Sequence, residues 1–95
     1  AEGSLLRKFG SEGAYDGQFS APSGVCVTAD DDIIVADSDH NRLQVFRADG
    51  TFVRKWGSKG AGNGQFDYPS AVAVSEGVVY VVDSDNDRVV IQDRS

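Results

Sequence analysis

Cysteine, histidine and proline are scarce in this sequence of 95 residues, which has one Cys, one His and two Pro. Because Cys26 has no second thiol to pair with, no disulfide can form within the chain, and this favours a reducing compartment. One histidine, His40, excludes a zinc site built from several imidazoles of one chain. We therefore expect a cytoplasmic protein with no metal and no cofactor.

Long apolar runs and basic residues are also lacking. No stretch approaches the roughly 20 apolar residues that a membrane helix needs, and the N-terminus shows no secretory signal. Nine Lys and Arg face 15 Asp and Glu, which gives a net charge of −6. An acidic chain of this kind disfavours phosphate-rich partners. The length allows one small domain, residues 1–95.

Groupings of residues that carry catalysis are missing as well. Ser20, Ser23 and Ser70 have no histidine at a plausible triad position. The glycine-rich segments lack the Lys-Ser/Thr ending of a phosphate-binding loop. The sequence therefore predicts a non-enzymatic protein without catalytic, cofactor-binding or metal-binding residues.

Short apolar stretches separated by turn residues are what the sequence does contain. The predicted strands of the central part are residues 24–28, 32–36, 42–46 and 51–56. The breaks between them are rich in Asp, Asn, Ser and Gly, which favour turns. The second of these strands and residues 78–82 are nearly continuous apolar runs, which predicts strands covered on both faces.

This four-strand unit is repeated along the chain. Residues 5–11 match residues 52–58 at a spacing of 47, and residues 37–39 match residues 83–85 at a spacing of 46, because the second copy has one residue fewer in a turn. Self-similarity at this period, with four strands per unit, indicates propeller blades.

The repeat boundaries follow from this match. Repeat 1 covers about residues 10–56 and repeat 2 about residues 57–95, while residues 5–10 form an additional outer strand. Phe9 and Trp56 occupy equivalent positions near the end of that outer strand. We predict that both side chains are largely buried.

Three motifs resemble the NHL repeat over residues 5–92. They are Gly-Gln-Phe-x-x-Pro-Ser-x-Val-x-Val, then Ile-Ile-Val-Ala-Asp-Ser-Asp-x-Asn-Arg-Leu-Gln-Val-Phe, then Asp-Gly-x-Phe-Val-x-Lys-Trp-Gly. The resemblance implies an all-β fold, a β-propeller with two four-stranded NHL blades per chain. It also implies similarity to the propellers of tripartite-motif NHL proteins, which are most often six-bladed and several of which bind RNA or protein partners.

Two blades cannot close a ring, and their flat apolar faces are typical of an interface. We expect a homotrimer in which three chains join head to tail into six blades, and residues 5–10 of one copy complete the last blade of another. A four-bladed dimer, an eight-bladed tetramer, and an engineered or truncated part of a longer propeller are the alternatives. The predicted closure residues are Leu5, Leu6, Phe9, Val89 and Ile91.

One face of the propeller is expected to carry the loops of residues 10–22 and 57–69 and the turns of residues 37–42 and 83–88. In the family that this sequence resembles, such a face commonly holds the ligand. The candidate residues there are Tyr15, His40, Arg42, Tyr68 and Arg88. Because acidic residues dominate this face, we favour a protein ligand, and an RNA-binding module is the alternative.

Residues 83–87 resemble the start of a calcium loop. The sixth and twelfth positions of the loop, which require Gly and Glu, hold Arg88 and Arg94 instead. We therefore interpret residues 83–87 as a polar turn whose first carboxylate, Asp83, accepts hydrogen bonds from backbone amides or pairs with Arg88.

Overall fold

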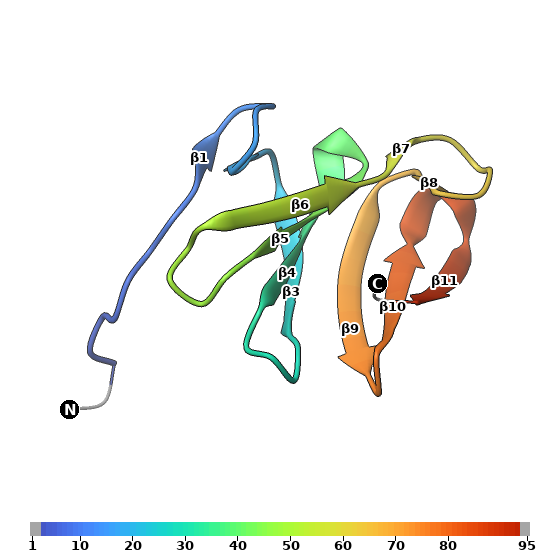
Figure 1. The fold of residues 1–95 in the computed structure, drawn as a ribbon. Coiled ribbons are helices and arrows are strands. Elements are labelled where there is room, and N and C mark those ends of the chain that lie inside the picture. Colours follow the sequence, from blue (N-terminus) through green and yellow to red (C-terminus); the bar gives the residue numbers. More distant parts are fainter. Residues whose placement is uncertain (1–2, 94–95) are drawn as a thin grey trace.

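The computed structural model describes residues 3–93, which form two antiparallel sheets and contain no α-helix (Figure 1). The strands of the first sheet, called the first blade here, are β3 (Pro22–Val27), β4 (Ile33–Asp37), β5 (Arg42–Phe46) and β6 (Phe52–Trp56). Those of the second blade are β9 (Pro69–Ser75), β10 (Val78–Asp83) and β11 (Arg88–Asp93). The predicted all-β architecture is confirmed.

Each blade is preceded by a loop that a short parallel strand pair closes. In the first loop β1 (Ser11–Glu12) pairs with β2 (Gln18–Phe19), and in the second β7 (Ser58–Lys59) pairs with β8 (Gln65–Phe66). A single 3₁₀ turn follows the second strand of each blade, η1 (Ser38–His40) and η2 (Ser84–Asn86).

Turn chemistry explains why the two repeats differ in length. The turn between β9 and β10 has two residues, Glu76 and Gly77, with φ of 52° and 77°. Two consecutive positive φ values are the geometry of the tightest hairpin turns. The corresponding turn of the first blade is longer, and the amide of Asp31 donates to the carbonyl oxygen of Thr28 at 2.9 Å.

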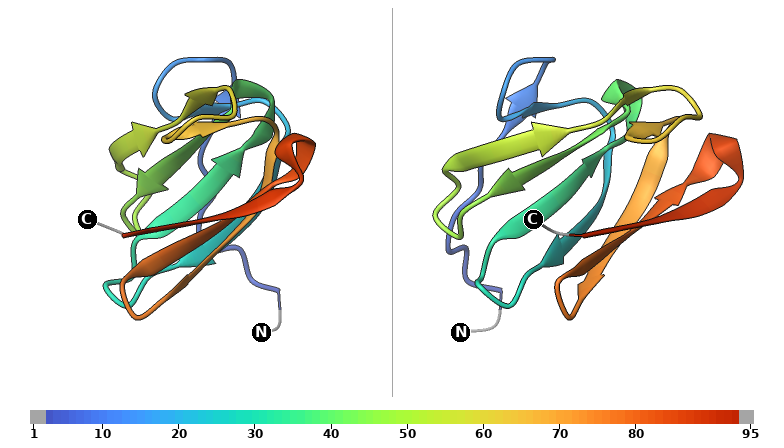
Figure 2. Two further views of the ribbon diagram at one scale, coloured as in Figure 1. Left: turned by 90° about the vertical axis from the view of Figure 1, so that its right-hand side faces the viewer. Right: turned by 45° about the vertical axis from the view of Figure 1, so that its right-hand side comes forward.

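The core lies between the two blades, which stack face to face (Figure 2). The buried side chains are Ile34, Ala36, Leu43 and Val45 from the first blade and Phe66, Val72, Val79 and Val81 from the second blade and its loop. The innermost strands β3 and β9 approach each other closely, and a Cβ added to Gly24 would lie only 2.7 Å from the Cα of Ala71. We call the whole packed contact between the two blades the closed junction.

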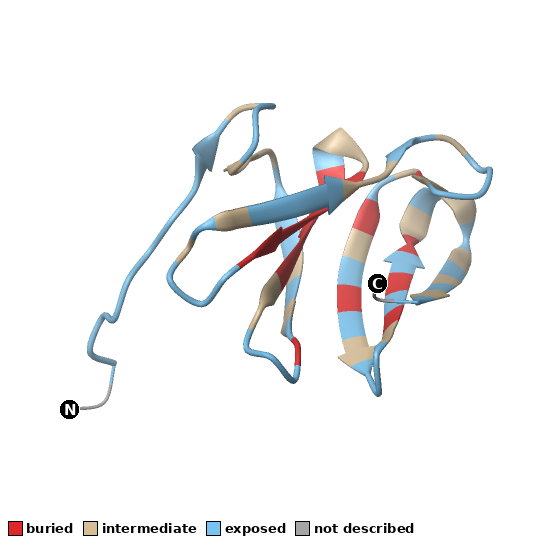
Figure 3. Ribbon diagram, in the orientation of Figure 1, coloured by how far each residue is buried: buried red, intermediate tan, exposed pale blue. Residues whose placement is uncertain are grey.

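Strands β4 and β10 differ in coverage although their sequences are similarly apolar. Both faces of β4 are buried, as predicted. In β10 Val79 and Val81 are buried, whereas Tyr80 and Val82 are 38% and 41% exposed, which gives the alternating bands of Figure 3. The prediction of two covered faces is wrong for β10, because residues 3–93 supply no further sheet to cover its outer face.

The segment before β1 forms no strand in the single chain, since no strand lies beside it to share backbone hydrogen bonds. Phe9 is 38% exposed, so the prediction that it is largely buried is wrong, and Trp56 is only half-buried. The Phe9 ring nevertheless packs on Phe46, with ring centroids 4.8 Å apart. One repeat later, Trp56 Nε1 donates to Gln92 Oε1 at 2.9 Å. Because Trp56 is equivalent to Phe9 and Gln92 is equivalent to Phe46, the two contacts join equivalent positions.

A buried aspartate at the end of the second strand fixes each loop. Asp37 accepts from the amide of Ser20 at 2.8 Å and from Nε of Arg42 at 2.7 Å. The Arg42 guanidinium also donates to the carbonyl oxygens of Ala14 and Gln18, both at 2.9 Å. The arginine therefore ties the loop to the sheet.

The second blade repeats this network. Asp83 accepts from the amide of Asp67 at 2.7 Å and from Nε of Arg88 at 2.8 Å. Arg88 donates to the carbonyl oxygens of Ala61 and Gln65 at 2.8 Å and 3.0 Å. These bonds confirm the interpretation of residues 83–87 as a polar turn.

We expect Gly24→Ala to lower the free energy of unfolding by about 1–3 kcal/mol, because the new methyl group would meet the backbone of β9, which cannot rotate away. Urea unfolding measures the loss. Ala48→Val is the control, since it enlarges an exposed side chain in the hairpin between β5 and β6, away from β9. Equal stability of Gly24→Ala and wild type would contradict the close approach of β3 and β9.

We expect Arg42→Ala to lower the free energy of unfolding by about 3–5 kcal/mol, because it leaves Asp37 as a buried, unpaired charge. Arg88→Ala is the matched comparison and should cost less, since the Arg88 side chain is 34% exposed and that of Arg42 only 10%. Denaturant unfolding of both variants tests this order. A loss below about 1 kcal/mol for Arg42→Ala would show that the pair does not hold the loop.

Candidate functional site

The two loops and the two 3₁₀ turns lie on one side of the molecule, at the top of Figure 1, and together form what we call the loop face. The arginine networks join each loop to the turn of its own blade. A further bond joins the two blades, because the amide of Tyr68 donates to Asn41 Oδ1 at 2.8 Å. The loop face is therefore a hydrogen-bonded surface.

The predicted ligand-face residues have different roles in the structure. Tyr15 is 81% exposed at the tip of the first loop, and Tyr68 is 37% exposed, with φ of 58°. His40 is half-buried. Arg42 is buried and Arg88 half-buried, and both hold the loops through hydrogen bonds. Tyr15 and Tyr68 are thus the aromatic side chains that the loop face presents to solvent.

A hollow of about 580 Å³ opens on the loop face beside the closed junction. His40 and Arg42 line it together with Lys55, Trp56 and Lys59. The sequence placed Lys59 on this face, within the loop of residues 57–69, but it did not indicate Lys55 and Trp56, because the end of an outer strand meets the 3₁₀ turn only through the fold. Lys55 also donates to Asp16 at 2.6 Å.

Acidic groups dominate the rest of the loop face. Asp37 and Asp83 are buried and paired with arginines, so they add little to the surface charge. The remaining carboxylates of the loops and turns are Glu12, Asp16, Asp39, Asp67, Asp85 and Asp87. They outnumber the lysines of the hollow, and the surface keeps its acidic character.

The shifted pKa values belong to structural groups. Burial raises the pKa of Asp83, but hydrogen bonds from Asn86, Asp67 and Arg88 outweigh it, so the net pKa is lowered. Hydrogen bonds from Thr51 lower the pKa of Asp49 in the hairpin between β5 and β6, and burial raises the pKa of the Cys26 thiol. Each shift favours the form present at neutral pH, unlike the shifts that poise a general acid or base for catalysis.

Two negative findings apply to residues 3–93. In that range no three side chains of His, Cys, Asp or Glu are placed to hold a metal ion together. Nor does that part of the chain contain a helix long and apolar enough to cross a membrane.

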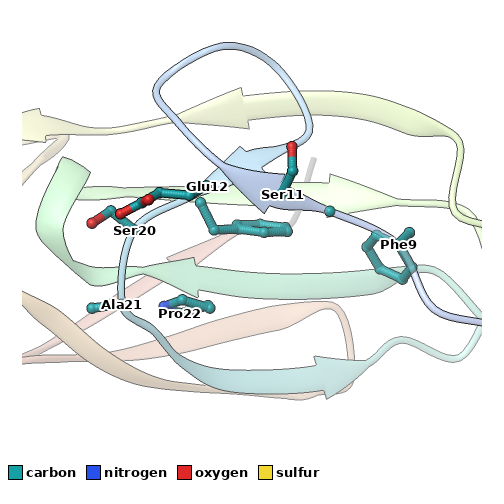
Figure 4. A pocket seen from close by; sticks show the side chains of 8 residues that line it. Phe9, Ser11, Glu12, Ser20, Ala21 and Pro22 are labelled. Atoms are coloured by element: carbon teal, nitrogen blue, oxygen red, sulfur yellow. The ribbon is translucent and has the colours of Figure 1, made fainter.

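The outer side of the first blade, called the front face here, is partly open. Val25 and Val27 are 63% and 58% exposed on β3. Beside them is a hollow of about 370 Å³, and Phe9, Ala21 and Pro22 are among the residues that line it (Figure 4).

The outer side of the second blade, called the far face here, is open over all three strands. Its exposed apolar side chains are Ala71, Ala73, Tyr80, Val82, Val89 and Ile91. Val89 and Ile91 are 58% and 63% exposed, and the pairing of β10 with β11 places them opposite Val82 and Tyr80. The far face is thus a continuous apolar surface.

The two open faces repeat the two sides of the closed junction. Tyr80, Val82, Val89 and Ile91 of the far face are equivalent to Ile34, Ala36, Leu43 and Val45, which are buried in that junction. On the front face, Val25 and Val27 are equivalent to Val72 and Val74, which pack against the first blade. Leu5 and Leu6, the other predicted closure residues, are 74% and 89% exposed.

Comparisons with known proteins agree with this architecture. The chain is 56% identical over 39 residues to the protein brain tumor of Drosophila melanogaster, a match that covers 41% of this chain and 4% of that protein. It is 54% identical over 39 residues to the B-box type zinc finger protein ncl-1 of Caenorhabditis elegans, which covers 41% and 5%. Its identity to protein lin-41 of Caenorhabditis elegans is 45% over 49 residues, which covers 52% and 4%. The chain thus spans a small fraction of the length of these relatives.

The family comparison matches the NHL repeat twice, at residues 19–46 and 66–91. The first match runs from β2 to the end of β5, and the second from β8 into β11, so each covers the inner three strands of one blade. The chain belongs to the NHL-repeat family.

Proposed function

We propose that the chain is a non-enzymatic NHL propeller module that joins head to tail with copies of itself into a closed ring. The loop face of the ring serves as a platform for a protein ligand. One observation carries the proposal: the exposed apolar side chains of the far face and of β3 occupy positions whose equivalents are buried or packed in the closed junction.

The chemistry of the open faces supports this assembly. A contiguous apolar surface of this kind marks an interaction site, and the complementary face lies on the opposite end of the same chain. Such a heterologous contact forms a closed ring when the rotation between copies allows closure. Three copies would give six blades, the number most frequent in the NHL propellers that this sequence resembles.

The segment before β1 fits the role of a donated strand. Phe9 contacts the first blade as Trp56 contacts the second, so this segment enters the chain where the last strand of a preceding blade would end. In the ring, residues 5–10 of one copy would pair with the free edge of β11 of its neighbour. This would bury Leu5 and Leu6, which are exposed in the single chain.

The loop face has features of a protein-binding surface. Tyrosine and arginine side chains are enriched at the energetic centres of protein interfaces, and Tyr15 is the most exposed aromatic residue of the loop face. The hollow lined by His40, Trp56 and Lys59 adds a concave element for a partner side chain. The excess of carboxylates favours a ligand with basic residues.

We expect the full chain of 10.1 kDa to form one discrete oligomer with the mass of three copies in light scattering. Removal of residues 1–10 should abolish it and leave monomer or aggregate, because β11 loses its partner strand. A four-copy or two-copy ring would revise the number but keep the assembly. A monomeric full chain, or an unchanged oligomer after truncation, would overturn strand donation.

A point substitution tests the far face without removing a segment. Ile91→Glu should give a folded monomer, because a charge on the exposed side chain is tolerated in one chain but not in an apolar contact. Ala48→Glu adds the same charge to the hairpin between β5 and β6 and is the control. If the mass of Ile91→Glu equals that of the control, the far face does not join copies.

RNA binding is the alternative function, and the acidic loop face speaks against it. We expect single-stranded and stem-loop RNA to bind no more tightly than about 10⁻⁵ M at physiological salt, since few cations are available to neutralise phosphates. Fluorescence anisotropy titration measures the affinity. Sub-micromolar, sequence-dependent binding would instead favour an RNA-binding NHL module.

A further inference from the structure

A pair of hydrogen bonds from the first 3₁₀ turn closes the polar edge of the closed junction. The hydroxyl of Ser38 donates to the carbonyl oxygen of Pro69 at 2.5 Å. Asn41 Oδ1 accepts from the amide of Tyr68 at 2.8 Å. Both bonds run from the turn of the first blade to the start of β9, and they fix the blades relative to each other beside the apolar core.

The second 3₁₀ turn presents the same pair of positions to the far face. Ser84 is equivalent to Ser38, and its hydroxyl contacts that of Ser70 as the hydroxyl of Ser38 contacts that of Ser23. The residue after the turn, Asp87, has φ of 52° and ψ of 43°.

These angles are nearly those of Asn41, 55° and 42°. The backbone therefore directs the Asp87 side chain as it directs that of Asn41. Among the described residues, the Asp87 carboxylate has no hydrogen-bond partner.

The front face offers the matching groups. Ala21 is equivalent to Tyr68 and has the same left-handed backbone, with φ of 53° against 58°. Within residues 3–93 its amide has no acceptor. Ala21 and Pro22 line the hollow of about 370 Å³ on the front face, whereas Ser84 and Asp87 line one of about 430 Å³ beside the far face. The groups on both faces that could meet between two copies thus line open hollows.

We propose that Ser84 and Asp87 of one copy form a polar latch on Ala21 and Pro22 of the next copy. The carboxylate of Asp87 accepts a hydrogen bond from the amide of Ala21, and the hydroxyl of Ser84 donates to the carbonyl oxygen of Pro22. This inference rests on the proposed self-assembly. It adds the residues that set the register of the contact, which an apolar surface alone does not fix.

The second repeat has a carboxylate, Asp87, where the first repeat has the amide Asn41. This difference strengthens the latch between copies. A hydrogen bond to an ionised acceptor is shorter and roughly twice as strong as one between neutral groups. An amide that is buried without an acceptor costs free energy, so closure of the front face requires an acceptor for Ala21. Asp87 supplies that acceptor from the neighbouring copy.

The test compares Asp87→Gly with Asp87→Asn in the full chain. Glycine removes the acceptor and tolerates the left-handed backbone, so the fold of the single chain is retained, as circular dichroism would verify. Asparagine restores the group that serves in the closed junction. Asp85→Ala is the matched control, because it removes an exposed carboxylate of the same turn that is not part of the latch.

Sedimentation equilibrium over a dilution series gives the dissociation constant of the oligomer. We expect Asp87→Gly to weaken each contact roughly 10- to 100-fold, and Asp87→Asn and Asp85→Ala to change it by less than about fivefold. An oligomer of Asp87→Gly as stable as wild type, or equal weakening by Asp85→Ala, would overturn the latch and leave the self-assembly standing. A monomeric wild type would overturn the proposed assembly itself.

Discussion

Face-to-face packing of two sheets is the interaction on which the rest of this structure depends. A sheet of three or four strands needs an apolar face covered to be stable. Here Ile34 and Leu43 of one blade are buried with Val79 and Val81 of the other. The glycine at position 24 lets the innermost strands approach to backbone contact. Because both blades have the same order of loop, strands and 3₁₀ turn and stack on each other, the two loops lie on the same side of the molecule.

Buried charge provides the second constraint, and it gives shape to loops that have little structure of their own. Asp37 and Asp83 are removed from water by the packing of the sheets, so each requires donors from its surroundings. Arginine meets this need and still has N–H groups for the loop carbonyl oxygens. A glycine-rich segment is thereby held in one conformation by the same pair that satisfies the carboxylate. The candidate arginines of the loop face act mainly in this way, and the exposed tyrosines are left to meet a ligand.

Repetition explains both the stability of the chain and the chemistry of its two open faces. One junction is satisfied between its blades, and each half of that junction is repeated on an open face. The repeats are not identical, since Tyr80 stands in the place of Ile34, Val82 in the place of Ala36 and Asp87 in the place of Asn41. Larger side chains and a negative charge make the far face chemically distinct from the first blade. A contact between copies would therefore have its own geometry and strength, although it uses the same pattern.

The sequence by itself determined the strands, their order and the family, because alternating turn residues and a repeat of 46–47 positions are local properties of the chain. It also indicated the pairing of Asp83 with Arg88, five residues away. Coverage was decided by tertiary structure: the apolar runs of β4 and β10 look alike, yet β4 is buried on both faces and β10 on one face only. For the same reason Phe9 is partly exposed, and the lysines of the loop-face hollow meet His40 only after folding. Burial depends on which elements are present to pack, and no local pattern carries that information.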